Sequence, residues 1–176
     1  MANTIAQEIF KHPQVVNLLE DAQVEKSIYW IDEDTGLLCK TRPDIWSLID
    51  GVGLVFDLKT TNDASQEKFT RSIRDGDYHI QMAMQKDGLM YHGHDIRYFG
   101  FVVSETKKPH YPFIYQATTE MIEQGQREYK EALKYMKFCI ENNCWSLERD
   151  VPIRLNFSEY QQSHNPFQKL EETYNV

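Results

Sequence analysis

The spacing of apolar and polar residues along the chain predicts most of its elements. Over residues 4–21 the apolar positions recur at helical intervals, but Pro13 interrupts them, which favours two short helices joined near His12. Residues 24–31 are rich in β-branched and aromatic side chains, and the turn sequence D-E-D-T-G separates them from a second run that opens at Leu37. We expect these two segments to form an antiparallel hairpin.

The middle of the chain contains the longest regular segments. Residues 52–58 form a near-continuous apolar run, which is typical of a strand in the centre of a sheet. We expect a helix over residues 78–91, a buried strand over residues 97–104 and an edge strand over residues 112–117. Residues 118–142 place apolar side chains on one helical stripe, after a capping hydroxyl. This order predicts an α/β fold of the restriction-endonuclease-like type, a mixed central sheet flanked by helices.

Length and composition favour a single domain without membrane segments. The 176 residues are enough for one core, which we place in residues 1–145, with residues 146–176 as a C-terminal arm. The three cysteines form no C-x-x-C pair, and their odd number argues against a disulfide framework, so a reduced cytoplasmic setting is expected. No apolar run is long enough to span a bilayer, and the N-terminus does not resemble a signal peptide.

The net charge of −8 argues against a free-standing DNA-binding protein, which normally carries a basic stripe. It does not exclude a nuclease, because bound metal ions neutralise the carboxylates of such a site and a local positive groove suffices.

The strongest candidate chemistry lies between residues 37 and 61. Asp44 follows a proline, and the apolar run of residues 52–58 leads into Asp57 and Lys59. Alternate strand residues point to opposite faces, so Asp57 and Lys59 are expected on one face, with Leu58 turned into the core. Two carboxylates and the Leu58 carbonyl match the oxygen ligands that Mg²⁺ prefers. The lysine could orient or deprotonate an attacking water.

A simpler interpretation stays open for the same residues. Asp57 and Lys59 could form a surface ion pair at a strand end, and Asp44 could cap a turn, because short patterns of this kind arise by chance. The combination of a proline-preceded aspartate, a buried strand and a following polar loop favours the metal site.

Several blocks resemble the RecE-type exonucleases, that is, the C-terminal nuclease domain of exodeoxyribonuclease VIII, in the PD-(D/E)xK nuclease superfamily. They are C-K-T-R-P-D ending at Asp44, D-L-K-T-T from Asp57, and Y-H-I-Q ending at Gln81. The segments V-E-K-S-I-Y-W, T-G-L-L-C-K, G-Q-R-E-Y and E-N-N-C-W are also similar, in the family's order. The resemblance covers the chain from about Glu25 to Trp145.

The resemblance implies roles for individual residues. Asp44 and Asp57 would be ligands of Mg²⁺, for which Mn²⁺ could substitute, Lys59 would be the catalytic lysine, and Gln81 would lie on a helix beside the site. Glu25 matches an acidic position of the family and could be a further ligand or proton acceptor; a solvated strand residue is the equal alternative.

Two histidines and a tyrosine have simpler interpretations. Tyr78 at a helix start is expected to pack, His79 to be a hydrogen-bonded structural group, and His12 to be a surface residue. The chain also departs from the family. RecE-type domains extend further upstream, whereas about two dozen residues precede Glu25 here, and Gln85 occupies the family's aromatic position one turn after Gln81.

Two functions follow from these observations. The first is a metal-dependent deoxyribonuclease of phage or prophage type, for which the resemblance implies digestion of linear duplex DNA, a homo-oligomeric ring and a single-strand annealing recombinase as partner. The alternative is a nuclease-derived, catalytically inactive binding protein, such as a phage-encoded inhibitor of a host defence nuclease. The shorter upstream segment and the charge of −8 motivate this alternative.

Overall fold

The computed structural model describes residues 2–49 and 51–145. The chain divides into two compact units, residues 1–133 and residues 134–176. The first unit holds the sheet, the hairpin and the candidate site. The predicted C-terminal arm, residues 146–176, lies outside the described residues, so the predicted boundary at residue 145 stays a prediction.

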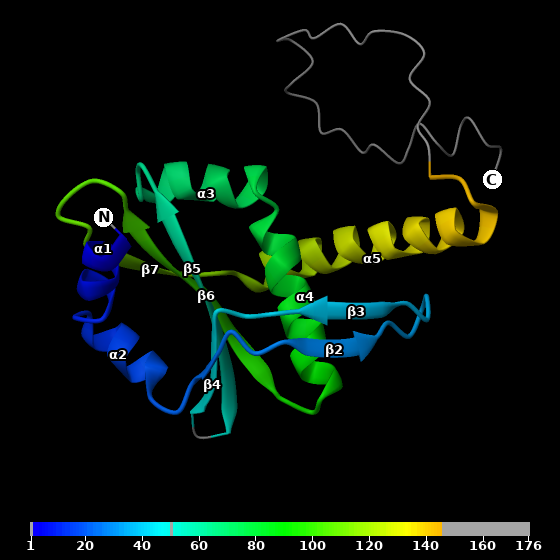
Figure 1. Ribbon diagram of the computed structural model, residues 1–176, viewed down its shortest axis with the longest axis horizontal. Coiled ribbons are helices and arrows are strands. Elements are labelled where there is room, and N and C mark those ends of the chain that lie inside the picture. Colours follow the sequence, from blue (N-terminus) through cyan, green and yellow to red (C-terminus); the bar gives the residue numbers. More distant parts are fainter. Residues whose placement is uncertain (1, 50, 146–176) are drawn as a thin grey trace, which may run out of the picture. The chain divides into compact units, whose positions relative to one another are not determined.

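Five strands form one mixed sheet in the order β1-β4-β5-β6-β7 (Figure 1). The central pair, β5 and β6, is parallel, and every other neighbouring pair is antiparallel. The central strand over residues 52–58 and the edge strand over residues 112–117 are therefore confirmed. The strands are β1 (Gln23–Val24), β4 (Ile45–Ile49), β5 (Val52–Thr61), β6 (Ile96–Glu105) and β7 (Pro112–Gln116).

Helices cover both faces of this sheet, which confirms the predicted fold class. On one face, α1 (Ala2–Ile9) and α2 (Pro13–Leu19) bury side chains against Phe56 and Val102. Pro13 is the first residue of α2, where its missing N–H costs nothing, so the prediction of two short helices is confirmed. On the other face, α3 (Gln66–Asp75), α4 (Tyr78–Tyr91) and the first half of α5 (Thr119–Asn142) pack against Val55 and Phe101.

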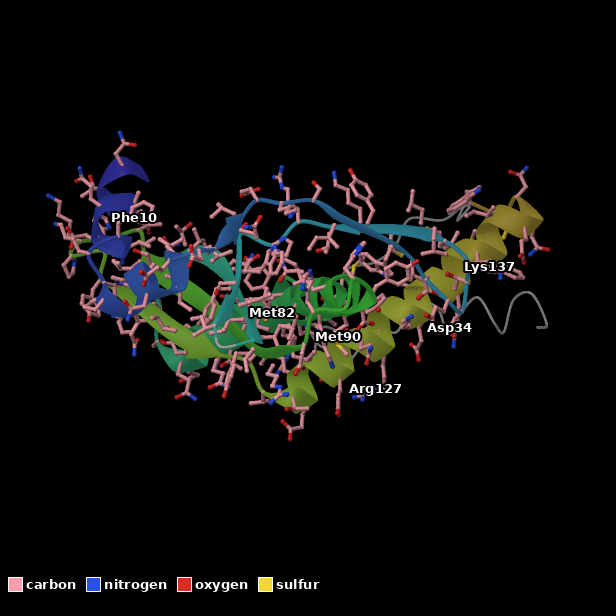
Figure 2. The ribbon with its side chains drawn as sticks, turned by 90° about the horizontal axis from the view of Figure 1, so that it is seen from below. Phe10, Asp34, Met82, Met90, Arg127 and Lys137 are labelled. Atoms are coloured by element: carbon pink, nitrogen blue, oxygen red, sulfur yellow. The ribbon has the colours of Figure 1, made fainter. Side chains whose placement is uncertain are left out.

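The predicted hairpin exists, but it stands apart from the main sheet. Strands β2 (Ile28–Ile31) and β3 (Leu38–Thr41) form a separate two-stranded sheet that packs across α4 (Figure 1 and Figure 2). The inner face of the hairpin is buried, with the Trp30 ring against Gly88 of α4. The prediction is wrong for Val24, which belongs to β1 and pairs with β4 of the main sheet.

Two elements, β4 and α3, were not expected from the sequence. Strand β4 is joined to β5 by a tight turn at Gly51, whose φ of +79° glycine adopts readily, and the Asp-Gly dipeptide between the two apolar runs is the signal that could have identified this hairpin. In α3 only Phe69 and Ile73, one turn apart, are buried. Two apolar positions in ten residues are too few to define a helical stripe.

Helix α5 fixes the position of α4 through close contact and two polar links. Gly125 faces the α4 backbone so closely that an added Cβ would lie 2.2 Å from the carbonyl oxygen of His79. Glu128 accepts a hydrogen bond from His79 (2.7 Å), and Gln126 donates to Asp87. Ile122 and Gly125 lie on the predicted buried stripe.

No helix of the described residues is long and apolar enough to cross a membrane.

Candidate active site

Strand β5 carries Asp57 and Lys59 on the sheet face that α3 and α4 cover. The two side chains form an ion pair, as their shared face predicts. The Asp57 side chain is 1% exposed and that of Lys59 is 17% exposed. The interpretation as a surface ion pair is therefore wrong, because both charges are largely removed from water.

Asp44 lies beside Leu58 because the pairing of β4 with β5 stops there. The last pair of the ladder is Ile45 with Phe56, and continuing this register would set Asp44 opposite Asp57 and then Pro43 opposite Leu58. Proline has no N–H to donate to the Leu58 carbonyl, so the β4–β5 ladder ends before this point. The Asp44 carboxylate instead accepts the Leu58 N–H (2.7 Å). The carbonyl of a strand residue points to the same side as its N–H, which leaves the Leu58 carbonyl oxygen on the Asp44 side.

The Leu58 side chain does not point into the core, so that expectation is wrong. It is 42% exposed. The Leu58 side chain lies on the sheet face that α1 and α2 cover, the same face as the core residue Phe56. Leu58 lies two residues beyond Phe56, the last β5 residue that pairs with β4. Only the main chain of Leu58 bears on the candidate site.

Helix α4 adds two amide side chains around Asp57. Gln81 donates to one Asp57 oxygen (2.6 Å) and accepts from the Lys59 ammonium (3.1 Å), so it bridges the ion pair. Gln85, one turn later, is fully buried and directs its amide nitrogen at the same Asp57 oxygen (3.4 Å). Its carbonyl oxygen has no hydrogen-bond partner among the described residues. The sequence analysis missed this contact, although the four-residue spacing of Gln81 and Gln85 on one helix face indicates it.

Tyr78 packs as expected and also contacts the catalytic candidate. The Lys59 ammonium lies 4.3 Å from the centre of the Tyr78 ring, a cation–π contact. The ring in turn packs against Phe101, at 6.0 Å between centroids. His79 is the hydrogen-bonded structural group that was predicted, with Glu128 as its partner. His12 is half-buried and its ring contacts that of Tyr111.

Glu25 is joined to Asp44 by a main-chain hydrogen bond, but its carboxylate is engaged elsewhere. Its N–H donates to the Asp44 carbonyl (3.1 Å), and its side chain forms a surface ion pair with Arg42 (2.7 Å). In the part of the chain that the structure describes, no three His, Cys, Asp or Glu side chains cluster in a way that could hold a metal. The candidate ligands are thus two carboxylates, Asp44 and Asp57, and one main-chain carbonyl.

The electrostatics of these residues fit a divalent cation with oxygen ligands. Burial raises the pKa of Asp57 above its ordinary value, although Lys59 lowers it, and the charge of Asp44 raises it further. A buried carboxylate that resists ionisation beside a second carboxylate is a place where an added cation relieves repulsion. Two carboxylates with a carbonyl and water are the ligands that Mg²⁺ uses, and sulfur and imidazole ligands are not part of the set.

The raised pKa of Asp57 predicts how stability depends on pH without metal. Because the folded-state pKa exceeds the unfolded value, the folded protein binds this proton more tightly, and stability rises as pH falls through the folded pKa. Asp57→Asn cannot take up this proton. We expect the unfolding free energy of wild type minus that of Asp57→Asn to increase as pH falls from 7 to 4, by about 1.4 kcal/mol for each tenfold difference in proton affinity between the folded and unfolded states.

Urea titrations of both proteins in EDTA across this range measure the difference. Other titrating groups are common to the two proteins and cancel. A difference that stays constant or shrinks towards pH 4 would contradict the raised pKa.

Comparison with known proteins gives one family and one informative fold. The model of a family described as "PDDEXK-like domain of unknown function (DUF3799)" matches residues 1–149. A crystal structure described as that of a "putative exonuclease" from Eubacterium rectale superposes with a TM-score of 0.63 at 16% identity, over 93% of this chain. The chain spans 65% of that protein's length, and at this identity the likeness shows the fold alone.

The other comparisons add no argument. The crystal structure of SSO0001 gives a TM-score of 0.42 at 14% identity, over 88% of this chain and 69% of that one. No curated protein matches the sequence.

Proposed function

Because the chain belongs to the family of PDDEXK-like domains, we propose that it is a metal-dependent, RecE-like deoxyribonuclease that hydrolyses the phosphodiester bonds of linear duplex DNA. The observation that carries the proposal is the buried pair of Asp57 and Lys59, with Asp44 held against the Leu58 main chain beside it. A purely structural ion pair does not require a second carboxylate, or a main-chain carbonyl on the side of that carboxylate, at the same point.

Each residue has a distinct role in this proposal. Asp44, Asp57 and the Leu58 carbonyl would hold the metal, Mg²⁺ or Mn²⁺, which when bound supplies Lewis acidity and lowers the pKa of a water. Lys59 positions the attacking water and offsets charge on the phosphate. Gln81 keeps Lys59 and Asp57 in one orientation through its two hydrogen bonds, and the Tyr78 ring supports the ammonium from the side.

Two measurements test the proposal together. Linear, nicked and single-stranded DNA are incubated with the protein and Mg²⁺ or Mn²⁺, and cleavage is followed on gels. Calorimetry measures Mg²⁺ binding to wild type and to Asp44→Asn. We expect linear duplex to be cut, and the Asp44→Asn variant to bind Mg²⁺ about 10- to 100-fold more weakly, because one of two carboxylates is lost.

Failure has a specific meaning here. If no DNA is cut and Mg²⁺ does not bind, the nuclease proposal is wrong. A stoichiometric protein partner recovered from host lysate in that case would favour the alternative of a nuclease-derived inhibitor of a host defence nuclease.

Glu25→Gln is the matched control for Asp44→Asn in the calorimetry. The Glu25 carboxylate pairs with Arg42, so loss of this carboxylate should leave Mg²⁺ binding within about twofold.

The finer parts of the proposal follow the RecE resemblance. They are processive digestion from 5′ to 3′, assembly of identical copies into a ring, a strand-annealing recombinase as partner, and a phage or prophage origin. Light scattering tests the assembly, and duplexes labelled at one end test the polarity.

A further inference from the structure

We infer that the outer face of the β2–β3 hairpin is a DNA-backbone contact surface that holds the duplex next to the candidate site. This inference rests on the proposed function for its ligand, and it concerns residues outside the candidate active site. The surface, called the ribbon face here, consists of two cross-strand pairs, Tyr29 with Lys40 and Ile31 with Leu38.

The ribbon face is open to solvent although its side chains are not typical of a solvated surface. Tyr29 is 50% exposed, Ile31 44% and Leu38 69%. Their strand neighbours on the inner face, Trp30 and Cys39, are buried against α4. The alternation of buried and exposed residues along both strands directs the outer-face side chains away from α4. An aromatic, a cationic and two aliphatic residues are thus presented together on a rigid support.

Charge favours a phosphate backbone as the ligand. Lys40 has no ion-pair partner among the described residues, and its ammonium lies 5.4 Å from the centre of the Tyr29 ring. Arg42, two residues later, forms an ion pair with Glu25 in which the arginine side chain is 59% exposed and the glutamate side chain 50%. Exposed pairs of this kind contribute at most about 1 kcal/mol, so Arg42 can exchange its partner for a phosphate at little cost.

The short chain segment between Lys40 and Asp44 limits how far the ribbon face can lie from the candidate site. Lys40 precedes Asp44 by four residues, which span at most about 14 Å. Along B-DNA this length corresponds to about four phosphates of one strand. A strand whose reacting phosphate lies at Asp44 therefore passes Lys40 within about four nucleotides. The acidic turn of the hairpin, with Glu33 and Asp34, lies at the opposite end, which sets the direction of contact towards the site.

Binding is measured in the Asp57→Asn background without divalent metal, so that no strand is cut. A fluorescent 30-base-pair duplex is titrated by anisotropy at several salt concentrations. We expect Lys40→Ala to weaken binding by about 15-fold at 50 mM and 4-fold at 200 mM salt, because losing one phosphate contact lowers the slope of log affinity against log salt by about 0.9. Lys40→Arg keeps the charge and should retain the slope.

A second variant and a control separate this surface from general effects. Tyr29→Ala should weaken duplex binding by a factor that does not change with salt concentration, because the tyrosine ring carries no charge. Lys11→Ala, in an exposed pair with Glu8 near the end of α1, should leave binding unchanged. Both variants lie on the surface, and circular dichroism checks their folding.

Three results would overturn the inference. The first is that the Asp57→Asn background protein does not bind the duplex at 50 mM salt. The second is that Lys40→Ala binds the duplex as tightly as the background protein. The third is that Leu38→Ser changes the molar mass of the protein in solution, which would assign the ribbon face to a contact between copies. Cleavage by wild type judges the proposed function separately. If wild type cuts DNA but Lys40→Ala does not weaken duplex binding, the inference about the ribbon face is wrong and the nuclease proposal stands. If Lys40→Ala weakens duplex binding but wild type cuts no DNA, the nuclease proposal is wrong and the inference about the ribbon face stands.

Discussion

Replacing Lys59 with alanine is expected to reduce cleavage of linear duplex DNA by about 10³-fold while Mg²⁺ binding is retained or becomes tighter. A positioned group that transfers or orients a proton in the transition state contributes about 10²- to 10⁴-fold. In the metal-free protein Lys59 is the cation that neutralises Asp57, so it competes with a metal for that carboxylate. Its removal therefore separates catalysis from binding, which a purely structural lysine would not do.

Single-turnover cleavage and calorimetry measure the two effects in the same preparations. Lys68→Ala is the matched control, because this lysine is an exposed residue of α3 in the same unit. Cleavage by Lys59→Ala within threefold of wild type would remove Lys59 from the mechanism. Weaker Mg²⁺ binding in the variant would show that Lys59 supports the metal site and does not compete with it.

The sequence predicts the part of this site that depends on strand geometry. The two-residue period of a strand suffices to place Asp57 and Lys59 on one face, and the proline before Asp44 predicts that the β4–β5 ladder ends beside Leu58. The position of the Leu58 side chain depends instead on where α1 and α2 stop covering the sheet. That boundary is a tertiary feature, and no local pattern near Leu58 reports it.

Gln85 illustrates a different limit. Its spacing from Gln81 puts the two amides on one face of α4, but its contact with Asp57 depends on the depth at which α4 packs over β5. A buried amide whose carbonyl lacks a partner is costly, about 1–3 kcal/mol. An aromatic side chain at this position would avoid that cost, so a second hydrogen bond to Asp57 is what the glutamine adds.

The hairpin shows the same division between local and tertiary information. Its strands and turn are readable from β-branched residues and the D-E-D-T-G sequence, whereas its separation from the main sheet is not. The inner face is buried because Gly88 of α4 leaves room for the Trp30 ring, a match between positions far apart in the chain. The exposed ribbon face follows only once that docking is known.

The packing of α4 on α5 predicts a second large effect, at Gly125. In a free helix, replacing glycine with alanine stabilises by about 1 kcal/mol. Here the added Cβ would lie 2.2 Å from the carbonyl oxygen and 2.5 Å from the carbonyl carbon of His79, and a backbone cannot yield as a side chain end can. We expect Gly125→Ala to destabilise the fold by about 3 kcal/mol, which lowers Tm by roughly 9 °C for a chain of this size.

Gly125→Ala should also disturb the candidate active site, because α4 carries Gln81 two residues after His79. Moving the start of α4 away from α5 shifts the amide that bridges Asp57 and Lys59, so we expect activity measured well below the lowered Tm to fall as well. Glu123→Ala, at an exposed position of the same helix, is the control and should change stability by less than about 0.5 kcal/mol. Calorimetric unfolding of both variants decides the matter. A Gly125→Ala protein as stable as wild type would show that α4 and α5 can separate, and the two polar links through Glu128 and Gln126 would then have to fix Gln81 without the close backbone contact.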